Sequence, residues 1–527
     1  MPDRTQVIIV GGGPVGVGLA VELGQRGVSC TLVERRTQLQ NIPKGQNLTQ
    51  RTLEHFYFWG IVDELRAARA MPNNYPIGGV TAYKNMMSDY WYAPPGRELV
   101  QSYYFEENDR LPQYSLEEVL RDKATTFPNV TLLYGQTVKK VQQDEKGVHV
   151  TVADETWPYD ETVHEADYVV GCDGGHSLVR ELAGIERRGS DFDQKMLLAV
   201  FRSKDLHQAF ERFPDRTTYR AMDPELEGYW MFFGRVDVGE SWFFHAPVPM
   251  DTTTENYDFQ ALLNRAAGFD FKAEFDHVGF WDLKVAVADR YQAGRVFIAG
   301  DAAHSHPPYG GYGLNNGLED ITNLGWKLAA VLQGWGGKDL LPSYSEERRP
   351  IFWETGEDFI AHGINQDREF LNAYSPDKDK VEFEKQWEAI STASRIGTYE
   401  PNYEGSVVVD GPAGGVCSAH GSHTFVARAG HHLPPQPLSS GKRLAAELGS
   451  NFTLLAFGAP TRAVTAFQES ADELGVPLKI IDDSFDGGRE QYEFRLILVR
   501  PDQYVVWTGD ETPSDMDGLI RKVVGRG

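Results

Sequence analysis

A glycine-rich turn near the start of the chain constrains the fold more than any other feature. The apolar run Val7–Val10 leads into the turn, and a second apolar run, Cys30–Val33, ends at Glu34, 18 residues after it. The turn contains Gly11, Gly13, Pro14, Val15 and Gly16, and it matches G-x-G-x-x-G. Such glycines let the backbone approach a pyrophosphate, and an acid at this distance accepts hydrogen bonds from a ribose. The pattern predicts a βαβ unit that binds an ADP-containing cofactor.

A second strand, loop and helix follow late in the chain, in Gly294–Leu332. The strand Val296–Ala299 ends at Asp301, and a loop rich in proline and glycine leads to a helix that we expect to begin near Asn315–Gly317. A carboxylate at the end of a strand is a good acceptor for a sugar-like hydroxyl, and a helix N-terminus stabilises an anionic or electron-rich group. This stretch alone also fits a plain structural turn.

A third junction lies between the first two. The apolar run Ala166–Gly171 leads to Asp173, and Arg180 lies in the helix that follows. In a parallel sheet the carboxyl ends of strands share one edge, where ligands bind. The three junctions therefore predict one cleft. A cofactor held by both an early and a late strand favours FAD over NAD, because NAD proteins usually complete their site within one contiguous domain.

Polar residues near the first junction have two interpretations. Arg35 and Arg36 follow the ribose acid and either contact a 2′-phosphate or form a solvated pair near adenosine, which we favour. Lys44 and Gln46 precede a predicted helix and either line the ligand or lie in a solvated loop.

The middle of the chain predicts a different kind of sheet. Residues 187–290 contain alternating apolar strands with many aromatic side chains, which indicate an antiparallel sheet. Most of these rings are expected in the core, and Tyr229, Phe244 and His245 are our candidates for the cleft. Residues 71–110 are also aromatic-rich, without clear periodicity, and are expected to form a surface excursion or a dimer contact.

Composition excludes several classes of protein. The net charge of −25 and the pI of about 5.0 argue against nucleic acid and anionic membrane surfaces as partners. Three widely spaced cysteines predict neither a disulfide framework nor a zinc site, so we expect no metal and a reducing, cytoplasmic location. We expect no signal peptide, and no apolar stretch approaches the roughly 20 residues of a membrane span.

Several motifs together resemble those of one enzyme family. GGGPVGVGLA with Glu34-Arg35, CDGGHSLVR, and GDAAHSHPPYGGYGLNNGLEDITNLGWKLA are similar to the three signatures of single-component FAD-dependent aromatic hydroxylases, the class A flavoprotein monooxygenases. The C-terminal RLILVRPDQYVVWTG resembles the thioredoxin-like tail of the phenol, hydroxyphenylpropionate and polyketide hydroxylase branch. The resemblance covers nearly the whole chain.

The resemblance implies an α/β fold with three parts. These are a Rossmann-like, p-hydroxybenzoate hydroxylase-like FAD-binding domain, an inserted antiparallel β-sheet domain for substrate, and a C-terminal thioredoxin-like domain. The last is expected to be redox-inactive because it has no Cys-x-x-Cys. The expected ranges are 1–186 and 291–373 for the FAD-binding domain, 187–290 for the substrate domain, 374–404 for a linker and 405–527 for the C-terminal domain. A homodimer is expected from the resemblance.

The resemblance also assigns cofactor residues. Asp173 and Arg180 match a motif implicated in FAD and NADPH binding, Asp301 matches the ribityl contact, and Gln113 matches a flavin contact. Lys44 stands where the family often has Arg, which leaves a phosphate contact less bidentate. The loop expected beside the isoalloxazine contains Pro308, Gly311, Gly313, Leu314 and Asn315.

The implied reaction is aromatic hydroxylation. NADPH or NADH reduces FAD, O2 adds to give a flavin C4a-hydroperoxide, and an activated, phenolic ring takes one oxygen atom. His304, His306 and His245 are candidate proton acceptors, and Pro307 and Pro308 are placed where oxygen and substrate meet. An epoxidase, a Baeyer–Villiger-type oxygenase or a halogenase on the same scaffold is the alternative, as is a non-catalytic protein that binds flavin or an aromatic compound.

Overall fold

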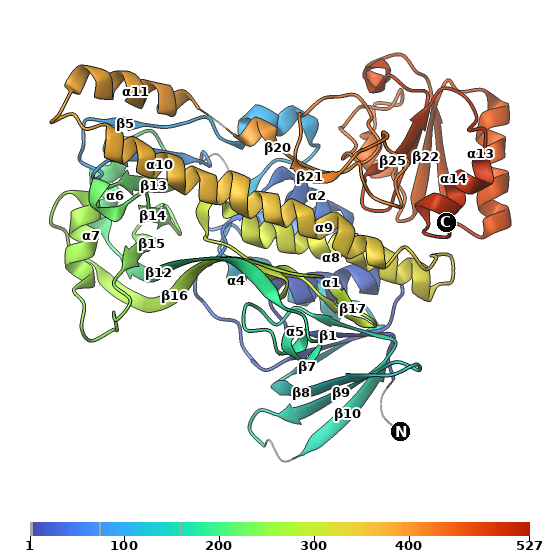
Figure 1. Ribbon diagram of the computed structural model, residues 1–527, viewed down its shortest axis with the longest axis horizontal. Coiled ribbons are helices and arrows are strands. Elements are labelled where there is room, and N and C mark those ends of the chain that lie inside the picture. The colour runs from blue at the N-terminus through green and yellow to red at the C-terminus, as the bar shows by residue number, and fades with distance from the viewer. Residues whose placement is uncertain (1–3, 73–74, 158–159, 394) are drawn as a thin grey trace.

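A computed structural model of the protein describes residues 4–72, 75–157, 160–393 and 395–527. It confirms the predicted α/β fold: a parallel sheet, a larger, mostly antiparallel sheet beside it, and a small C-terminal α/β domain at the opposite end (Figure 1). Long helices cross the middle of the molecule between these parts (Figure 1).

The parallel sheet brings the three predicted junctions together. Its order is β17-β18-β11-β1-β2-β7, so the strands that precede the three loops are neighbours, and only the edge strand β17 is antiparallel. The strands are β1 (Val7–Val10), β2 (Cys30–Glu34), β7 (Val130–Tyr134), β11 (Tyr168–Gly171), β17 (Gln292–Ala293) and β18 (Val296–Ile298). The accompanying helices are α1 (Pro14–Gln25), α2 (Gln50–Phe58), α3 (Val62–Ala67), α4 (Gln113–Thr125) and α5 (Leu178–Leu182). Two small sheets flank it, β3 (Asn47–Leu48) with β6 (Asp109–Arg110), and β8 (Gln136–Gln143), β9 (Val148–Asp154) and β10 (Glu161–Ala166).

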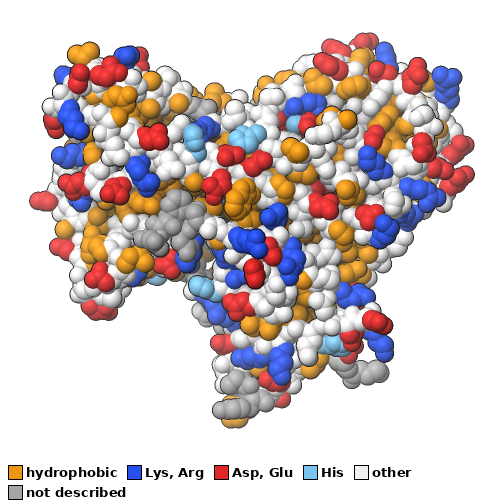
Figure 2. All heavy atoms as spheres, in the orientation of Figure 1, with side chains coloured by type: hydrophobic (Ala, Val, Ile, Leu, Met, Phe, Trp, Pro, Cys, Tyr) orange, Lys and Arg blue, Asp and Glu red, His pale blue; other side chains and the backbone are white. Residues whose placement is uncertain are grey.

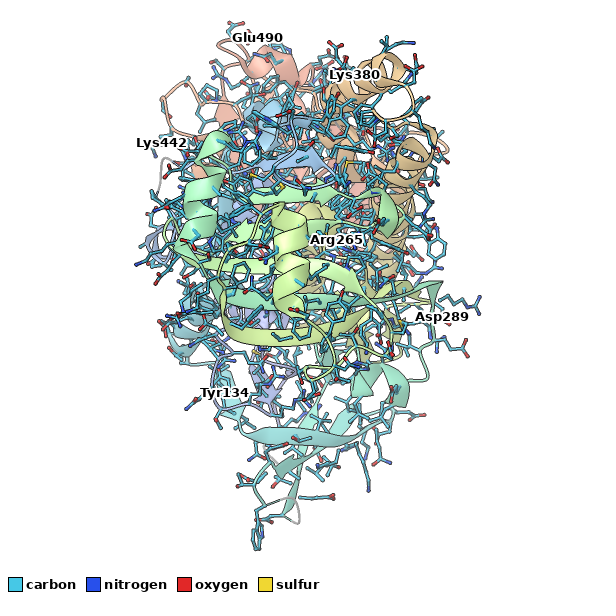
Figure 3. All side chains as sticks on the ribbon, turned by 90° about the vertical axis from the view of Figure 1, so that its left-hand side faces the viewer. Tyr134, Arg265, Asp289, Lys380, Lys442 and Glu490 are labelled. Carbon is cyan, nitrogen blue, oxygen red and sulfur yellow. The ribbon has the colours of Figure 1, made fainter. Side chains whose placement is uncertain are left out.

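The larger sheet has eight strands in the order β19-β16-β12-β15-β14-β13-β4-β5. They are β4 (Gly79–Tyr83), β5 (Trp91–Tyr92), β12 (Arg187–Arg202), β13 (Thr218–Met222), β14 (Met231–Arg235), β15 (Ser241–Val248), β16 (Glu274–Ala288) and β19 (His304–Ser305). The expected surface excursion in 71–110 is thus wrong in part, because β4 pairs in parallel with β13 and extends the sheet. α6 (Lys204–Ala209) and α7 (Phe259–Ala267), which carries Arg265, cover the outer face, as Figure 3 shows for α7.

The C-terminal half begins with helices. They are α8 (Tyr312–Leu332), α9 (Pro342–Glu354), the π-helical turn Thr355–Ala361, α10 (His362–Ala373) and α11 (Lys380–Thr392). α8 begins three residues before the predicted start, and α11 lies within the range expected to be a linker. The C-terminal domain has a βαβ unit, a hairpin and a last helix, as expected of a thioredoxin-like domain. Its elements are β20 (Tyr399–Tyr403), β21 (Cys417–His420), α12 (Leu444–Glu447), β22 (Phe452–Phe457), α13 (Thr461–Leu474), β23 (Leu478–Asp483), β24 (Leu496–Val499), β25 (Val505–Gly509) and α14 (Met516–Val523).

The surface carries charges of both signs. On the face seen in Figure 2, acidic and basic side chains are interspersed among apolar ones. In the part of the chain that the structure describes, no helix has the length and apolar composition to cross a bilayer.

Helix α8 is buried along most of its length and is held by charge pairs. Every residue from Asn315 to Ala330 is buried. Asp320 accepts hydrogen bonds from His304 Nε2 at 2.6 Å, from Arg348 Nε at 2.8 Å and from the backbone N–H of Gly300 at 3.1 Å. Buried charges are tolerated when they are paired in this way. The pairs fix α8 against the loop that follows β18.

Glu347 on α9 joins α8 to the C-terminal domain. Its carboxylate accepts two hydrogen bonds from Arg500, at 2.8 and 2.9 Å, and lies 2.7 Å from Lys327 Nζ on α8. Asn323 on α8 and Ser406, which follows β20, donate to it at 2.6 Å each. All three charged side chains are fully buried, so Glu347 balances two cations that water cannot reach.

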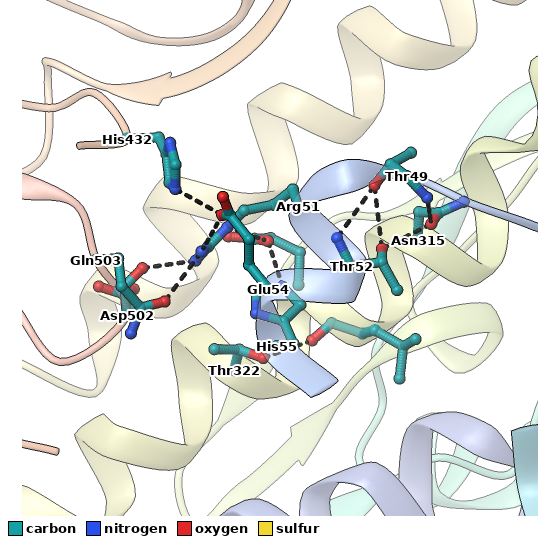
Figure 4. Close-up of polar contacts among 12 residues, drawn as sticks. Thr49, Arg51, Thr52, Glu54, His55, Asn315, Thr322, His432, Asp502 and Gln503 are labelled. Carbon is teal, nitrogen blue, oxygen red and sulfur yellow. Dashed lines mark hydrogen bonds and ion pairs between the residues drawn. The ribbon is translucent and has the colours of Figure 1, made fainter. Parts of the chain in front are cut away.

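A second set of contacts joins the C-terminal domain to α2 (Figure 4). Arg51 donates to the carbonyl of Asp502 at 2.6 Å and to Gln503 Oε1 at 2.9 Å, and it pairs with Glu319 of α8 at 3.2 Å. His432 lies 2.8 Å from Glu54. The C-terminal domain is therefore tied to the helices beside the parallel sheet by direct polar contacts.

We predict that Glu347→Gln destabilises the protein strongly. The amide keeps the shape of the side chain but leaves Lys327 without its charge partner, and loss of one member of a buried pair costs about 3–5 kcal/mol. A urea titration followed by circular dichroism measures the effect. Glu346→Gln removes the same charge from the exposed neighbouring position and is the control. Equal unfolding midpoints for the two variants would contradict the account.

The same carboxylate predicts a pH dependence. Burial by itself raises the pKa of Glu347, but Arg500 and Lys327 outweigh burial and hold the pKa well below its ordinary value of 4.5. A carboxyl whose pKa is depressed by folding stabilises the folded state above the unfolded-state pKa, and this contribution is lost as the pH falls. The difference in unfolding free energy between the wild type and Glu347→Gln should shrink as the pH falls below about pH 4.5. A pH-independent difference would contradict the assignment.

Candidate functional site

The three junctions enclose a cavity of about 520 Å³ between the parallel sheet, the N-terminus of α8 and the eight-stranded sheet. Its lining from the parallel-sheet side includes Gly13, Pro14, Val15, Arg36, Lys44, Gly45, Gln46, Gln113, Cys172 and Asp301. The helix and the larger sheet contribute His306, Pro308, Gly311, Gly313, Leu314, Phe232, Phe243 and His245, and Asn47 and Arg110 come from the β3–β6 ribbon.

The first glycine turn is packed so closely that side chains are excluded from it. Gly11 has φ +106°, and a Cβ there would lie 2.4 Å from the carbonyl oxygen of Cys172. A Cβ on Gly16 would lie 1.9 Å from the carbonyl oxygen of Gly11. By contrast, a Cβ on Gly13 would meet no atom within 4 Å, because this residue faces the cavity. The turn thus presents bare backbone to the cavity at the start of α1.

Glu34 lies beside this turn and shapes it. Its carboxylate accepts hydrogen bonds from the backbone N–H groups of Gly12 at 2.6 Å and Arg36 at 2.8 Å. Carboxylate oxygens accept more than one hydrogen bond, so the predicted ribose contact is still available. Arg35 is exposed and lies outside the cavity lining, whereas Arg36 is part of it.

Asp173 and Arg180 brace the second junction. Asp173 accepts hydrogen bonds from the Ser177 hydroxyl at 2.5 Å and from the N–H of Val179 at 3.1 Å, at the start of α5. Arg180 donates to the carbonyl of Ala302 at 2.9 Å, next to Asp301. Neither side chain lines the cavity, although both were predicted to bind cofactor. The structure places them where they hold the second and third loops together.

Asp301 presents a carboxylate without a protein partner. It lies deep in the molecule, where burial raises the pKa of its carboxyl, yet its side chain is exposed to the cavity. Among the described residues, none donates a hydrogen bond to this carboxylate. A carboxylate that faces a cavity with free lone pairs is suited to the hydroxyl groups of a ligand.

The N-terminus of α8 also points to the cavity. Gly311 is its N-cap, with φ +69°, and no side chain caps the first turn or places an acid in it. Gly313 and Leu314 of this turn line the cavity, so its N–H groups and the positive end of the helix dipole are available to a ligand. Asn315, also predicted to touch cofactor, instead bonds Thr49 N–H at 2.9 Å and the Thr52 hydroxyl at 2.6 Å, which joins α8 to α2.

Lys44, Gln46 and Gln113 line the cavity wall, so a contact of each with a bound cofactor stays a prediction. The Lys44 side chain is exposed, Gln46 is buried and donates to the carbonyl of Pro43 at 3.2 Å, and Gln113 donates to Glu117 at 2.7 Å.

The larger sheet contributes an aromatic wall. On β15, Phe243 and His245 face the cavity, and on the neighbouring β14 Phe232 stacks on His245 with ring centroids 4.9 Å apart. Phe244, which we predicted to face the cleft, points to the opposite side and packs in the core under α6 and α7. Adjacent residues of a strand face opposite sides, so Phe244 and His245 cannot both line the cavity. Tyr229 likewise lies outside the lining, in an apolar cluster with Tyr309.

The candidate histidines separate into two kinds. His304 is buried, bonds Asp320 and stacks on Phe352 with centroids 3.7 Å apart, so it braces the loop. His306 and His245 line the cavity, and each has a ring nitrogen without a hydrogen-bond partner, Nε2 and Nδ1 respectively. Burial lowers the pKa of each to about 4, so both are neutral at pH 7. The buried Pro307 lies outside the lining, next to Pro308.

The residues present fit FAD. The open face of Gly13, the unpartnered carboxylate of Asp301 and the uncapped N-terminus of α8 suit a pyrophosphate, a polyhydroxyl chain and an electron-rich ring, in that order. Among the described residues, no group of three or more His, Cys, Asp or Glu side chains could hold a metal ion.

The cavity wall also contains Arg110, Phe232 and Phe243, which were not predicted from the sequence. Phe243 could have been found from its two-residue offset from His245 along the strand. Arg110 lies in a two-residue strand without a recognisable pattern, and its environment arises only from long-range contacts.

Comparisons with known proteins agree with this geometry. Residues 4–358 match the family described as FAD binding domain, and residues 426–527 match the one described as aromatic-ring hydroxylase, C-terminal. The FAD-dependent monooxygenase apdD of Emericella nidulans is 28% identical over 98% of this chain and 90% of its own length. RebC soaked with chromopyrrolic acid superposes over the whole of both chains with a TM-score of 0.87 at 28% identity. Aklavinone-11 hydroxylase, in a complex with FAD and aklavinone, does so with a TM-score of 0.81 at 26% identity.

A family match over more than half of the chain, the shared fold and a cavity suited to FAD lead to one assignment. The chain belongs to the FAD-dependent aromatic hydroxylases, the class A flavoprotein monooxygenases whose C-terminal domain is of the aromatic-ring hydroxylase type.

Proposed function

We propose that the protein hydroxylates a phenolic or related aromatic substrate, with O2 and NADPH or NADH as co-substrates. The observation that carries the proposal is that one continuous cavity has two kinds of wall. One wall is made by the glycine turn, Asp301 and the N-terminus of α8, and the other by Phe232, Phe243 and His245. A flavin and an aromatic ring held in this cavity would lie side by side.

Different residues of the chain would bind the cofactor, stabilise its charge and bind the substrate. Bound FAD, reduced by NAD(P)H, would activate O2 for transfer of one oxygen atom to the ring. Asp301 and the backbone at Gly13 would hold the ribityl and pyrophosphate groups, and the first turn of α8 would stabilise negative charge on the reduced flavin ring. Phe232 and Phe243 would bind a flat ligand and keep water away from the reacting atoms.

His245 and His306 would orient the substrate. A group whose pKa is about 4 is a weak base at pH 7, and a general base works best when its pKa lies near the working pH. Their unpartnered nitrogens can still accept a hydrogen bond from a phenolic hydroxyl. We therefore assign positioning of the hydroxyl to these two side chains.

The relatives support this function. Aklavinone-11 hydroxylase, similar over its whole length, holds FAD and aklavinone in one complex. The sequence has a single G-x-G-x-x-G turn of the βαβ type, so the nicotinamide cofactor would bind transiently across the cavity and not in a domain of its own.

A direct test combines flavin content, NAD(P)H oxidation and product mass. The purified protein should contain FAD, should oxidise NADPH or NADH faster when phenols are added, and should yield a product heavier by one oxygen atom derived from O2. A lactone, an epoxide or a halogenated product would overturn hydroxylation, and a protein that binds no FAD would overturn the proposal as a whole.

We predict that Asp301→Asn weakens FAD binding about tenfold, because a hydrogen bond to a charged group contributes roughly 1.5–3 kcal/mol. Fluorescence titration of the apoprotein with FAD measures the dissociation constant. Asp282→Asn, at an exposed position of β16, is the matched control. Unchanged affinity in Asp301→Asn would show that this carboxylate does not touch the cofactor.

We predict that His245→Leu raises KM for the phenolic substrate about tenfold and changes kcat less than threefold. The variant loses one hydrogen bond to the substrate, worth about 1–1.5 kcal/mol, and keeps the apolar wall. Steady-state kinetics at saturating FAD measure both constants, and His362→Leu at an exposed position is the control. A fall in kcat of a hundredfold or more would instead indicate proton transfer by His245.

A further inference from the structure

Arg110, in the wall of the cavity, is a buried cation without an acidic partner. Its residue is 2% exposed. Nη1 donates to Asn47 Oδ1 and Nη2 to the carbonyl of Arg235, each at 2.8 Å, while Nε has no partner. Both acceptors are neutral, and among the described residues no carboxylate lies within 4 Å of the guanidinium.

The neighbouring Arg235 does not supply the missing charge. It donates to the Tyr219 hydroxyl at 3.1 Å and lies over the Trp242 ring at 4.5 Å, also without an acidic partner among the described residues. Asp109, next to Arg110 in sequence, pairs with Arg69 at 3.2 Å. The elements around Arg110 thus bury two cations and no compensating anion.

This arrangement contrasts with the buried charges of α8 and α9. On α8 and α9, buried Lys327, Arg348 and Glu347 each have an opposite charge within 2.8 Å. An unpaired buried charge costs several kcal/mol. Burial lowers the pKa of Arg110 to about 9, so the side chain is still a cation at pH 7. A protein that maintains such a cation in a cavity wall gains by placing an anion against it.

The position of Arg110 indicates what kind of anion this is. Its guanidinium carbon lies 5.6 Å from the centre of the Phe243 ring, and Arg235, whose carbonyl it binds, lies at the end of β14. Both contacts belong to the sheet that forms the aromatic wall. A bound flavin would have its own partners at Asp301 and the first turn of α8, which line other walls of the cavity.

We infer that the aromatic substrate carries an oxyanion, a carboxylate or an ionised hydroxyl, which pairs with Arg110 while its ring lies against Phe243 and Phe232. This inference rests on the proposed function, because it assumes that the substrate binds in this cavity. Arg110 then selects anionic over neutral ligands of the same shape. A charge-assisted hydrogen bond in a desolvated site makes this selection at least about tenfold.

The test uses two matched pairs of ligands and calorimetry on the FAD-loaded protein without NAD(P)H, at pH 8. One pair is 3-hydroxy-2-naphthoate and its amide, and the other is 2,4,6-trichlorophenol, which is ionised at this pH, and its methyl ether. The anion of at least one pair should bind the wild type ten or more times as tightly as its neutral partner. Arg110→Met should reduce this ratio to below threefold, and Arg110→Lys should keep part of it.

Arg212→Met removes one charge from the exposed surface of the same domain and should leave the ratio unchanged. If Arg110→Met does not fold or loses FAD, the ratios of anion to neutral affinity in the wild type and in Arg110→Lys test the inference. Equal affinities within both pairs in the wild type overturn the inference.

A ratio that survives in Arg110→Met, with a lowered reduction potential of the ligand-free flavin, also overturns it and assigns the cation to the reduced flavin. If the enzyme hydroxylates neutral phenols without preferring anions, this inference fails and the proposed function stands. If no FAD binds, the proposed function fails first.

Discussion

The carboxylate of Glu347 holds together the parts on which the cavity depends. It balances Lys327 from α8 and Arg500 from the C-terminal domain, with all three side chains out of reach of water. One residue further along α9, Arg348 pairs with Asp320, which in turn bonds His304 and the N–H of Gly300. These contacts fix the position of the Asp301 loop relative to α8. The C-terminal domain, which has no Cys-x-x-Cys, thus pairs through Arg500 with α9, which in turn holds α8 and the Asp301 loop.

The distribution of charge along α8 has two consequences. Glu319 and Asp320 point to different partners, the first to Arg51 and His55 on α2 and the second to the strand β18 loop, so the helix is tied on two sides. Its first turn carries no acid, which leaves the positive end of the dipole to the cavity. Arg36, Lys44 and Arg110 line the same cavity against Asp301. A chain with a net charge of −25 has therefore assembled a basic pocket, suited to the phosphates of a dinucleotide and to an anionic ligand.

What the sequence could predict follows from the range of each interaction. Each of the three strand, loop and helix junctions was predictable because its own apolar run, glycines and acid lie within about thirty residues of one another. The pairing of β4 with β13 was missed because it joins segments some 140 residues apart with no local signal. Phe244 was chosen in place of Phe243 because the register in the sheet decides which side chains of a strand face the cavity, and that register is not visible in the sequence. The roles of His304 and Arg110 depend on which partners lie nearby, Asp320 for the first and no acid for the second, and those partners come from distant parts of the chain.

One cavity should receive both FAD and the aromatic ligand. A crystal structure of the FAD-loaded protein with a bound aromatic ligand tests it most directly. We expect electron density for the pyrophosphate at Gly13, for the ribityl chain beside Asp301 and for the flavin ring at the first turn of α8, with the ligand between that ring and Phe243. Density for FAD elsewhere on the protein, or for a ligand separated from the flavin by the sheet, would contradict it.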